Sequence, residues 1–298
     1  MKLLYLLTAV GMLTLQSHAT VFDVVSLDRI EGAGCANAVI SPDGSFVVTG
    51  NDTGLEKIDL ATGARTQVAE GEGLYDVAVS ADGTKVAYVR PSFNERHLRH
   101  ISLEAVDIAS GKRKVVVKPS RRLNAGISFA GSTVCAVEKG KAKRSNLGKG
   151  KALQAPLASI NYGHLDVTVD GKTTSIDPNG PGSYLWPQVS PNGKRVVYRL
   201  SGFGTYTCNL DGSDVRPVGN YMMTVWAGND SLIGVAEEGG IAQQPTASRL
   251  VAVDIATGET QRLTPDEILA SFPSVSADGR KVIFGDSDGA LYLLQLSK

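Results

Sequence analysis

The stretch that decides the fold is VAVSADGTKVAYV, residues 77–89. Two apolar runs flank an Asp-Gly pair, and Asp-Gly suits the positive φ angles of a tight turn between antiparallel strands. The stretch therefore predicts a β-hairpin. Its turn occurs four times in the chain, as SPDG at Ser41–Gly44, SADG at Ser80–Gly83, SPNG at Ser190–Gly193 and SADG at Ser276–Gly279. Recurrence of one hairpin indicates a repeat architecture.

Two weaker copies of the turn lie at Ser128–Gly131 and around Trp226–Asp230. A second motif follows several copies, and each time another apolar run comes after it. This motif reads IDLATG at Ile58–Gly63, VDIASG at Val106–Gly111 and VDIATG at Val253–Gly258. One repeat is thus predicted to be four strands, a to d, with short turns between a and b and between c and d.

The spacing of the six turns, 36 to 62 residues, predicts an all-β, six-bladed β-propeller with about 46 residues per blade. The last repeat ends at its third strand. We expect residues 21–30 to supply the missing strand by pairing with residues 290–296, which closes the ring without a free edge. The expected blades are 31–72, 73–122, 123–182, 183–220, 221–267 and 268–298, the last completed by 20–30.

These motifs resemble the TolB-type, WD40-like six-bladed propeller repeats, in which Ser-Pro-Asp-Gly is followed by an apolar-Asp-x-x-Thr-Gly motif and then by Leu-Thr. Arg262–Thr264 matches the last element. TolB also has an N-terminal α/β domain, which we do not expect here because only about twenty residues precede the first repeat. The resemblance implies a fold and little about function, because the repeated residues form turns and core.

The first nineteen residues have the pattern of a signal peptide. Lys2 precedes a mostly apolar stretch, Leu3–Leu15, and Ser17 and Ala19 are small residues at the −3 and −1 positions of a cut before Thr20. We therefore expect export to the periplasm or the cell exterior. No later apolar run reaches the ~20 residues of a membrane helix.

The composition excludes several classes of function. Thirty basic and thirty acidic residues give a net charge of zero, which offers no electrostatic basis for binding nucleic acid. Cys35, Cys135 and Cys208 lack the spacing of a zinc site, and we interpret them as buried small residues, with one disulfide as the alternative. No cofactor or metal is expected.

The irregular insertions fall on one face of the predicted ring, the face of the b–c loops. They are Pro91–His100, Lys139–Ser159 and Glu237–Ser248. Variable loops on a rigid scaffold commonly carry binding sites. Counting four residues back from each turn predicts a half-polar, half-aromatic rim around the axis, suited to a sugar or peptide. The expected rim is Asn37, Asp76, Asn124, Trp186, Met222 and Phe272.

Basic residues gather in two of these insertions and could bind an anionic polysaccharide, lipid head group or acidic protein tail; a merely solvated loop is the alternative. The expected basic set is Arg96, His97, Arg99, Lys139, Lys141, Lys143, Arg144, Lys149 and Lys151.

Catalytic signals are weak. Gly285–Gly289 matches G-x-S-x-G by letter, but it joins two strands instead of a strand and a helix. The expected rim holds one carboxylate, Asp76, and no histidine. We therefore expect an exported, non-catalytic, monomeric propeller that binds a protein or glycan of the cell envelope. The alternatives are a propeller lyase or glycosidase and a scaffold component of an envelope complex.

Overall fold

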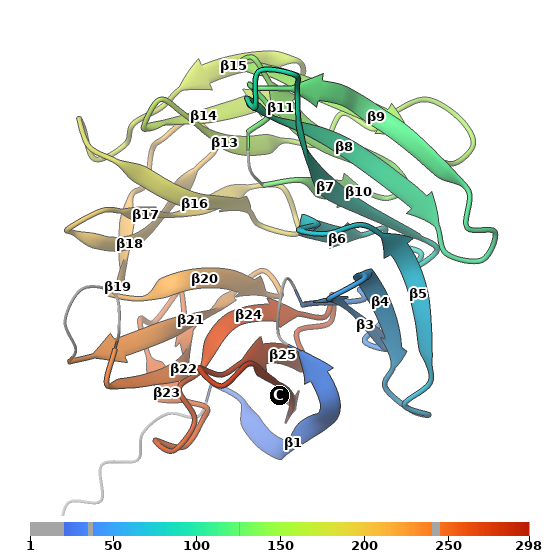
Figure 1. Cartoon of the computed structure of the whole chain (residues 1–298). Coiled ribbons are helices and arrows are strands. Elements are labelled where there is room, and N and C mark those ends of the chain that lie inside the picture. The colour runs from blue at the N-terminus through green and yellow to red at the C-terminus, as the bar shows by residue number, and fades with distance from the viewer. Residues whose placement is uncertain (1–20, 35–37, 125, 240–244, 298) are drawn as a thin grey trace, which may run out of the picture.

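The computed structural model describes residues 21–34, 38–124, 126–239 and 245–297. These residues form 26 strands in seven antiparallel sheets, which follow one another around a ring in chain order (Figure 1). The expectation of an all-β propeller is confirmed. The expectation of six blades is wrong, because the ring has seven. The expected signal peptide, residues 1–19, and Cys35 lie outside the described residues.

The blades are numbered along the chain. Blade 1 contains β2 (Val39–Ile40), β3 (Phe46–Asn51), β4 (Gly54–Asp59) and β5 (Arg65–Glu70), and blade 2 contains β6 (Tyr75–Val79), β7 (Lys85–Phe93), β8 (Arg99–Asp107) and β9 (Arg113–Ser120). Blade 3 contains β10 (Ser128–Ala130), β11 (Thr133–Glu138) and β12 (Lys141–Asn146), and blade 4 contains β13 (Leu157–Asn161), β14 (His164–Val169) and β15 (Lys172–Ser175). Blade 5 contains β16 (Tyr184–Val189), β17 (Arg195–Leu200), β18 (Gly204–Asn209) and β19 (Arg216–Gly219), and blade 6 contains β20 (Met222–Ala227), β21 (Ser231–Glu238), β22 (Ala247–Asp254) and β23 (Thr260–Arg262). Blade 7 contains β24 (Ser271–Val275), β25 (Lys281–Gly285), β26 (Ala290–Ser297) and, from the other end of the chain, β1 (Asp23–Gly34).

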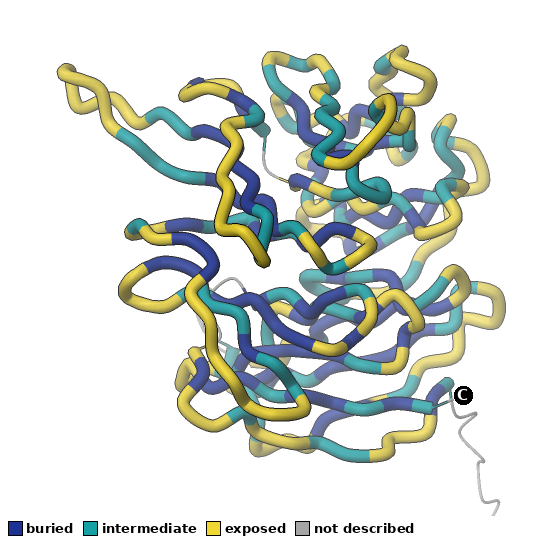
Figure 2. Tube along the Cα trace, turned by 90° about the vertical axis from the view of Figure 1, so that its right-hand side faces the viewer, coloured by how far each residue is buried: buried dark blue, intermediate teal, exposed yellow. Residues whose placement is uncertain are grey.

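The core is divided into clusters between neighbouring blades, because each sheet is buried on both faces by the next sheet around the ring. Buried positions follow the middle strands, whereas exposed positions follow the turns and loops (Figure 2). Cys135 and Cys208 are buried free thiols within this core, and burial raises the pKa of each; that of Cys208 rises to about 12.

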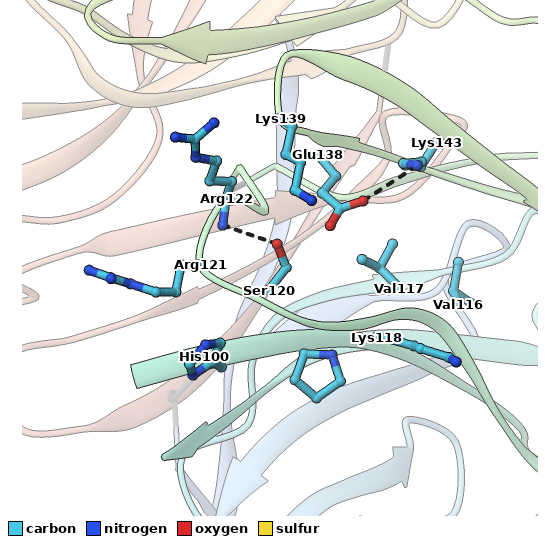
Figure 3. Close-up of a pocket in the computed structure, with 11 residues that line it drawn as sticks. His100, Val116, Val117, Lys118, Ser120, Arg121, Arg122, Glu138, Lys139 and Lys143 are labelled. Carbon is cyan, nitrogen blue, oxygen red and sulfur yellow. Dashed lines mark hydrogen bonds and ion pairs between the residues drawn. The ribbon is translucent and has the colours of Figure 1, made fainter. Parts of the chain in front are cut away.

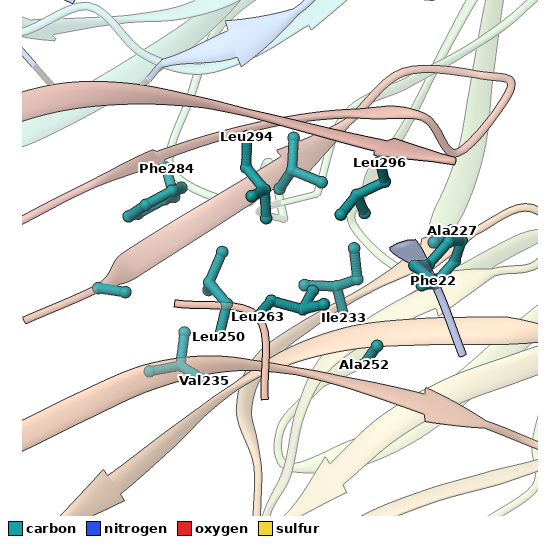
Figure 4. Close-up of a cluster of buried hydrophobic side chains, with 12 residues drawn as sticks. Phe22, Ala227, Ile233, Val235, Leu250, Ala252, Leu263, Phe284, Leu294 and Leu296 are labelled. Atoms are coloured by element: carbon teal, nitrogen blue, oxygen red, sulfur yellow. The ribbon is translucent and has the colours of Figure 1, made fainter. Parts of the chain in front are cut away.

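The N-terminal segment joins two blades. β1 pairs antiparallel with β26, from Asp23 opposite Ser297 to Gly34 opposite Ala290. Just before it, Phe22 is buried between blades 6 and 7, in the cluster drawn in Figure 4. The Phe22 backbone N–H donates to Gln261 Oε1 at 2.8 Å, and Gln261 Nε2 donates to the Phe22 carbonyl at 2.7 Å. The N-terminal segment therefore joins blades 6 and 7 through the β1–β26 pairing, the buried Phe22 side chain and two hydrogen bonds to Gln261.

The blade count differs because residues 123–182, expected as one blade, form two three-stranded sheets. The insertion 139–159, expected as a loop, contributes β12 and the first part of β13. Three X-Gly pairs make the new hairpins, and each places both residues at positive φ, as a type I′ turn requires. They are Lys139-Gly140, Tyr162-Gly163 and Asp170-Gly171.

Among the described residues, blade 4 has no counterpart of the inner strand that begins the other blades. Pro156, just before β13, lies against Gly193 beyond the end of β16, and the Gly163 carbonyl, just after β13, accepts from Tyr184 N at the start of β16. β13 thus runs antiparallel to β16, the inner strand of the next blade. This is the direction that the second strand of a blade takes. Leu153 lies against Gly131, so the connection before β13 fills the place of the missing turn.

The repeated serine explains why its turn recurs. Ser80 is fully buried; its Oγ donates to Asp82 Oδ1 at 2.6 Å and accepts from Lys85 N at 2.9 Å. The turns also touch one another around the ring. Ala81 N donates to the Gly131 carbonyl, and the same kind of contact joins blade 7 to blade 1. In the four blades that carry it, this short motif therefore orders the first hairpin and places it against a neighbouring blade.

We expect Phe22→Ala to lower the free energy of unfolding by about 3–5 kcal/mol, because it empties a buried site between two blades. Urea titration of the purified chain measures this. Val25→Ala is the matched control, since Val25 lies in the same segment with 64% of its surface exposed. Equal stability of the two variants would show that the ring holds without this contact.

We expect Ser80→Ala to cost about 1–2 kcal/mol of stability at neutral pH, through two lost hydrogen bonds. The hydrogen bond from Ser80 is the main cause that lowers the pKa of Asp82. A carboxyl with a lowered pKa stabilises the fold above its unfolded pKa and loses that effect as pH falls through its folded pKa. The deficit of the variant should therefore shrink in acid. Thermal melts across pH check this against exposed Ser201→Ala; a pH-independent deficit would contradict it.

Candidate functional site

A bulge recurs near the start of the inner strand in four blades. The pairing register shifts between Tyr75 and Ala78 in β6, and at the matching places of β16, β20 and β24. A bulge inserts an unpaired residue and turns its side chain to a new direction. The residue at positive φ in each bulge is Asp76 (50°), Trp186 (47°), Met223 (48°) or Phe272 (50°).

This backbone conformation is costly for these residues. Positive φ costs a residue with a Cβ roughly 1–2 kcal/mol, and bulky residues are rarely found there. Four such residues at one level of the ring are a repeated, strained feature. Strain of this kind concentrates at binding and catalytic sites.

All four residues line one pocket on the axis of the ring. It encloses about 940 Å³ and is bounded by β6, β10, β16, β20, β24 and the start of blade 1. Phe272 keeps 60% of its surface exposed and Trp186 keeps 43%, so their aromatic faces are available to a ligand. Valine, isoleucine, alanine and proline side chains supply most of the remaining wall, which makes the pocket largely apolar.

Asp76 is the single titratable side chain in the described lining of this pocket. Its Oδ2 accepts from Gly126 N at 2.8 Å and from Ile127 N at 3.4 Å, so it also links blade 2 to blade 3. Burial raises the pKa of Asp76, and the two backbone hydrogen bonds partly oppose that rise. The carboxyl group is therefore held in a fixed direction at the pocket wall.

A second polar residue belongs to the pocket lining. Thr224 lines the same pocket and is 8% exposed, yet its Oγ1 is buried without a hydrogen-bond partner among the described residues. A buried hydroxyl left unpaired costs about 1–3 kcal/mol. A ligand or water that reached it would recover part of that cost.

The predicted rim is only partly present. Asp76, Trp186 and Phe272 line the pocket, and Asn37 lies outside the described residues. Met222 is replaced by its neighbour Met223, because the degenerate turn of blade 6 starts one residue later than the sequence count assumed. Asn124 lies elsewhere and donates through Nδ2 to the Ile160 carbonyl at 2.7 Å. The glycine that precedes β10, Gly126, has a φ of 91° and lies beside Asp76, to whose Oδ2 its N–H donates.

The predicted basic set is divided among separate places. Arg96, His97 and Arg99 belong to the tip of the β7–β8 hairpin, and the Arg99 guanidinium lies 5.4 Å from the centre of the Tyr75 ring. The lysine-rich run expected as one loop instead extends along β12. Its residues are Lys139 in the turn, Lys141, Lys143 and Arg144 in the strand, and Lys149 and Lys151 in the connection beyond it.

Among the described residues, no three His, Cys, Asp or Glu side chains come together as metal ligands would. Nor does any helix there have the length and hydropathy to cross a membrane.

No protein-family model matches the sequence, and neither does any curated protein sequence. Solved structures show similarity of fold. The WD40 β-propeller domain of Doa1 aligns with a TM-score of 0.63 at 11% identity, covering 92% of this chain and 96% of that one. TolB from Acinetobacter baumannii aligns with 0.52 at 16%, covering 87% and 64%. An oligogalacturonate lyase in complex with manganese aligns with 0.48 at 18%, covering 88% and 77%. At these identities the likeness indicates a propeller and nothing about activity.

We expect Phe272→Gly to be more stable than Phe272→Ala by about 1 kcal/mol, because glycine adopts positive φ without strain. Glycine in an ordinary strand is instead less stable than alanine. Thermal unfolding of both variants measures the order, and Val275 in the same strand is the control site, where alanine should be the more stable. Alanine above glycine at both sites would mean that residue 272 is unstrained.

Proposed function

We propose that this protein is an exported, non-catalytic propeller that binds a segment of a partner protein, or a glycan, in its axial pocket. The supporting observation is the set of four strained bulge residues that present Trp186, Met223, Phe272 and Asp76 to one hollow. Residues held in strained backbone conformations are concentrated at binding and catalytic sites, which supports a binding role for this hollow. Export is part of the proposal and rests on residues 1–19.

The chemistry of the wall favours a peptide. Exposed aromatic faces beside methionine and proline suit an apolar side chain, and the Asp76 carboxyl group provides one directed hydrogen-bonding or charged contact. A sugar would stack on Trp186 or Phe272 and bond to Asp76, so a glycan stays the second kind of partner.

The titratable residues of the pocket wall favour a non-catalytic role over the activity of a glycosidase or lyase. Most glycosidases require two carboxyl groups across the scissile bond. The described lining offers one, Asp76, and no histidine. The scaffold role in an envelope complex is compatible with peptide binding and is distinguished from it by whether the pocket is needed.

The test is a binding screen on a glycan array and a displayed peptide library, followed by titration of the best ligand. We expect Trp186→Ala and Asp76→Asn each to weaken binding about tenfold or more, which corresponds to about 1.4 kcal/mol. Val25→Ala, an exposed change on the outer strand β1, is the matched control. Undiminished binding by both pocket variants would place the site elsewhere.

A further inference from the structure

Blade 3 has an open outer edge. β12 pairs with β11 on one side and, among the described residues, with no strand on the other. In the five four-stranded blades the corresponding third strand is paired on both sides. The chain that follows β12 does not run along this edge. It turns back at the end of β12, where Asn146 Nδ2 donates to the Lys149 carbonyl. It then passes the start of β11, where Leu153 N donates to Thr133 Oγ1.

The hydrogen-bond pattern identifies the free backbone groups. Leu147 N donates to the Ser132 carbonyl at 3.0 Å, which continues the β11–β12 ladder. Because antiparallel partners alternate, residues 141, 143 and 145 face β11, and the N–H and C=O groups of Ala142 and Arg144 point away from it. The edge therefore presents donors and acceptors in the spacing that another strand would match.

The surface beside this edge is basic. A pocket of about 630 Å³ lies between the end of β9 and the β11–β12 hairpin (Figure 3). Its charged or titratable lining residues are His100, Lys118, Arg121, Arg122, Glu138, Lys139 and Lys143. Glu138 is the one acidic residue among them and lies 3.4 Å from Lys143 Nζ. The pocket therefore carries a clear excess of positive charge.

One face of β12 borders this pocket. Lys143 lines it, and Ser145, two residues further along β12, accepts a hydrogen bond at 3.1 Å from Lys114 of β9. Side chains alternate along a strand, so Lys141 shares this face. A strand added beyond β12 would likewise direct every second side chain towards these lysines.

We propose that β12 accepts an extended acidic segment of a partner protein as the fourth strand of blade 3. The added strand runs antiparallel to β12, as the fourth strands of the other blades run to their third strands, and carries Asp or Glu at alternate positions. Backbone bonds to Ala142 and Arg144 hold it, and the basic pocket selects its charge. A second copy of β12 is a poor occupant, because like-charged lysines would face one another. This site is separate from the axial pocket and does not rest on the function proposed for it.

The probe is a blocked, fluorescent octapeptide of alternating Thr and Glu, measured by fluorescence anisotropy. A peptide of the same composition with its four Glu in one block has the same charge without the alternation. We expect the alternating peptide to bind about tenfold more tightly and to weaken as salt rises. Equal binding of the two peptides would overturn the proposal in favour of a general anion-binding surface.

Two variants separate the backbone from the charge contribution. Ala142→Pro removes one outward N–H group without removing a β11 ladder bond, since proline is tolerated on edge strands. We expect about tenfold weaker binding, and no loss from the matched change Thr173→Pro on the outer strand of blade 4. Lys141→Glu with Lys143→Glu should also weaken binding, whereas Lys172→Glu with Lys194→Glu should not. A folded Ala142→Pro variant that binds as the parent does would overturn strand addition.

Hydrogen exchange of the unmodified chain gives a readout that does not depend on variants folding. The amides of Ala142 and Arg144 should exchange more slowly once the alternating peptide is bound, because they then donate to its backbone. Binding without this protection would overturn the proposal. The Trp186→Ala variant changes the axial pocket and should bind the peptide as the parent does. A failure of the strand-addition proposal can therefore be distinguished from a failure of the function proposed for the axial pocket.

Discussion

A buried hydroxyl group organises this propeller. The serine that begins each long turn donates to the acidic or amide side chain two residues on, and it accepts from the backbone N–H where the next strand starts. The donor and acceptor capacity of the hydroxyl is used inside the protein, where an unpaired polar group is costly. Because each of the four turns that begin with this serine also donates a hydrogen bond to the turn of a neighbouring blade or accepts one from it, the directions of the inner strands of blades 1, 2, 5 and 7 are set at this face of the ring.

The axial pocket depends on that arrangement. Inner strands fixed at their turn ends converge at the axis, and a bulge near their other ends directs one side chain inward. The residues that the bulges hold at positive φ would be more relaxed as glycine. Aromatic, methionine and aspartate side chains there oppose local stability, which is the pattern expected where a protein keeps a residue for what it contacts.

Blades 3 and 4 have three strands each, whereas the other five blades have four. This difference affects the surface both at the axis and at the rim of the ring. Within the described ranges blade 4 has no inner strand, and a hollow of about 430 Å³ opens between β10 and β16 beside the axial pocket. Blade 3 has no outer strand in the part of the chain that the structure describes, so β12 has an unpaired edge there, next to a basic surface. Lysines on such an edge oppose pairing between identical copies while leaving it attractive to acidic chains. One scaffold thus presents an apolar hollow at its axis and a basic surface at its rim.

The sequence by itself determined the propeller, because turn chemistry is local. Ser-x-Asp-Gly needs only its own neighbours to form a hairpin, and its recurrence with the Thr-Gly motif specifies four-stranded units. The Lys139-Gly140 and Tyr162-Gly163 pairs carried the same local signal for the extra hairpins. They were not recognised because the basic run between them, residues 139–151, was interpreted as part of a loop insertion.

Tertiary structure decided the blade count and the make-up of the site. Two additional strands split residues 123–182 into two sheets only because each found a partner strand and a neighbouring blade. Asp76, Trp186 and Phe272 could be located by counting back from a clear turn. Met223 and Gly126 could not, since their turns are degenerate and a shift of one residue reverses the face of a strand. The positive φ of the bulge is likewise invisible in sequence, because only packing against the surrounding blades holds a bulky residue in a conformation that it would not adopt alone.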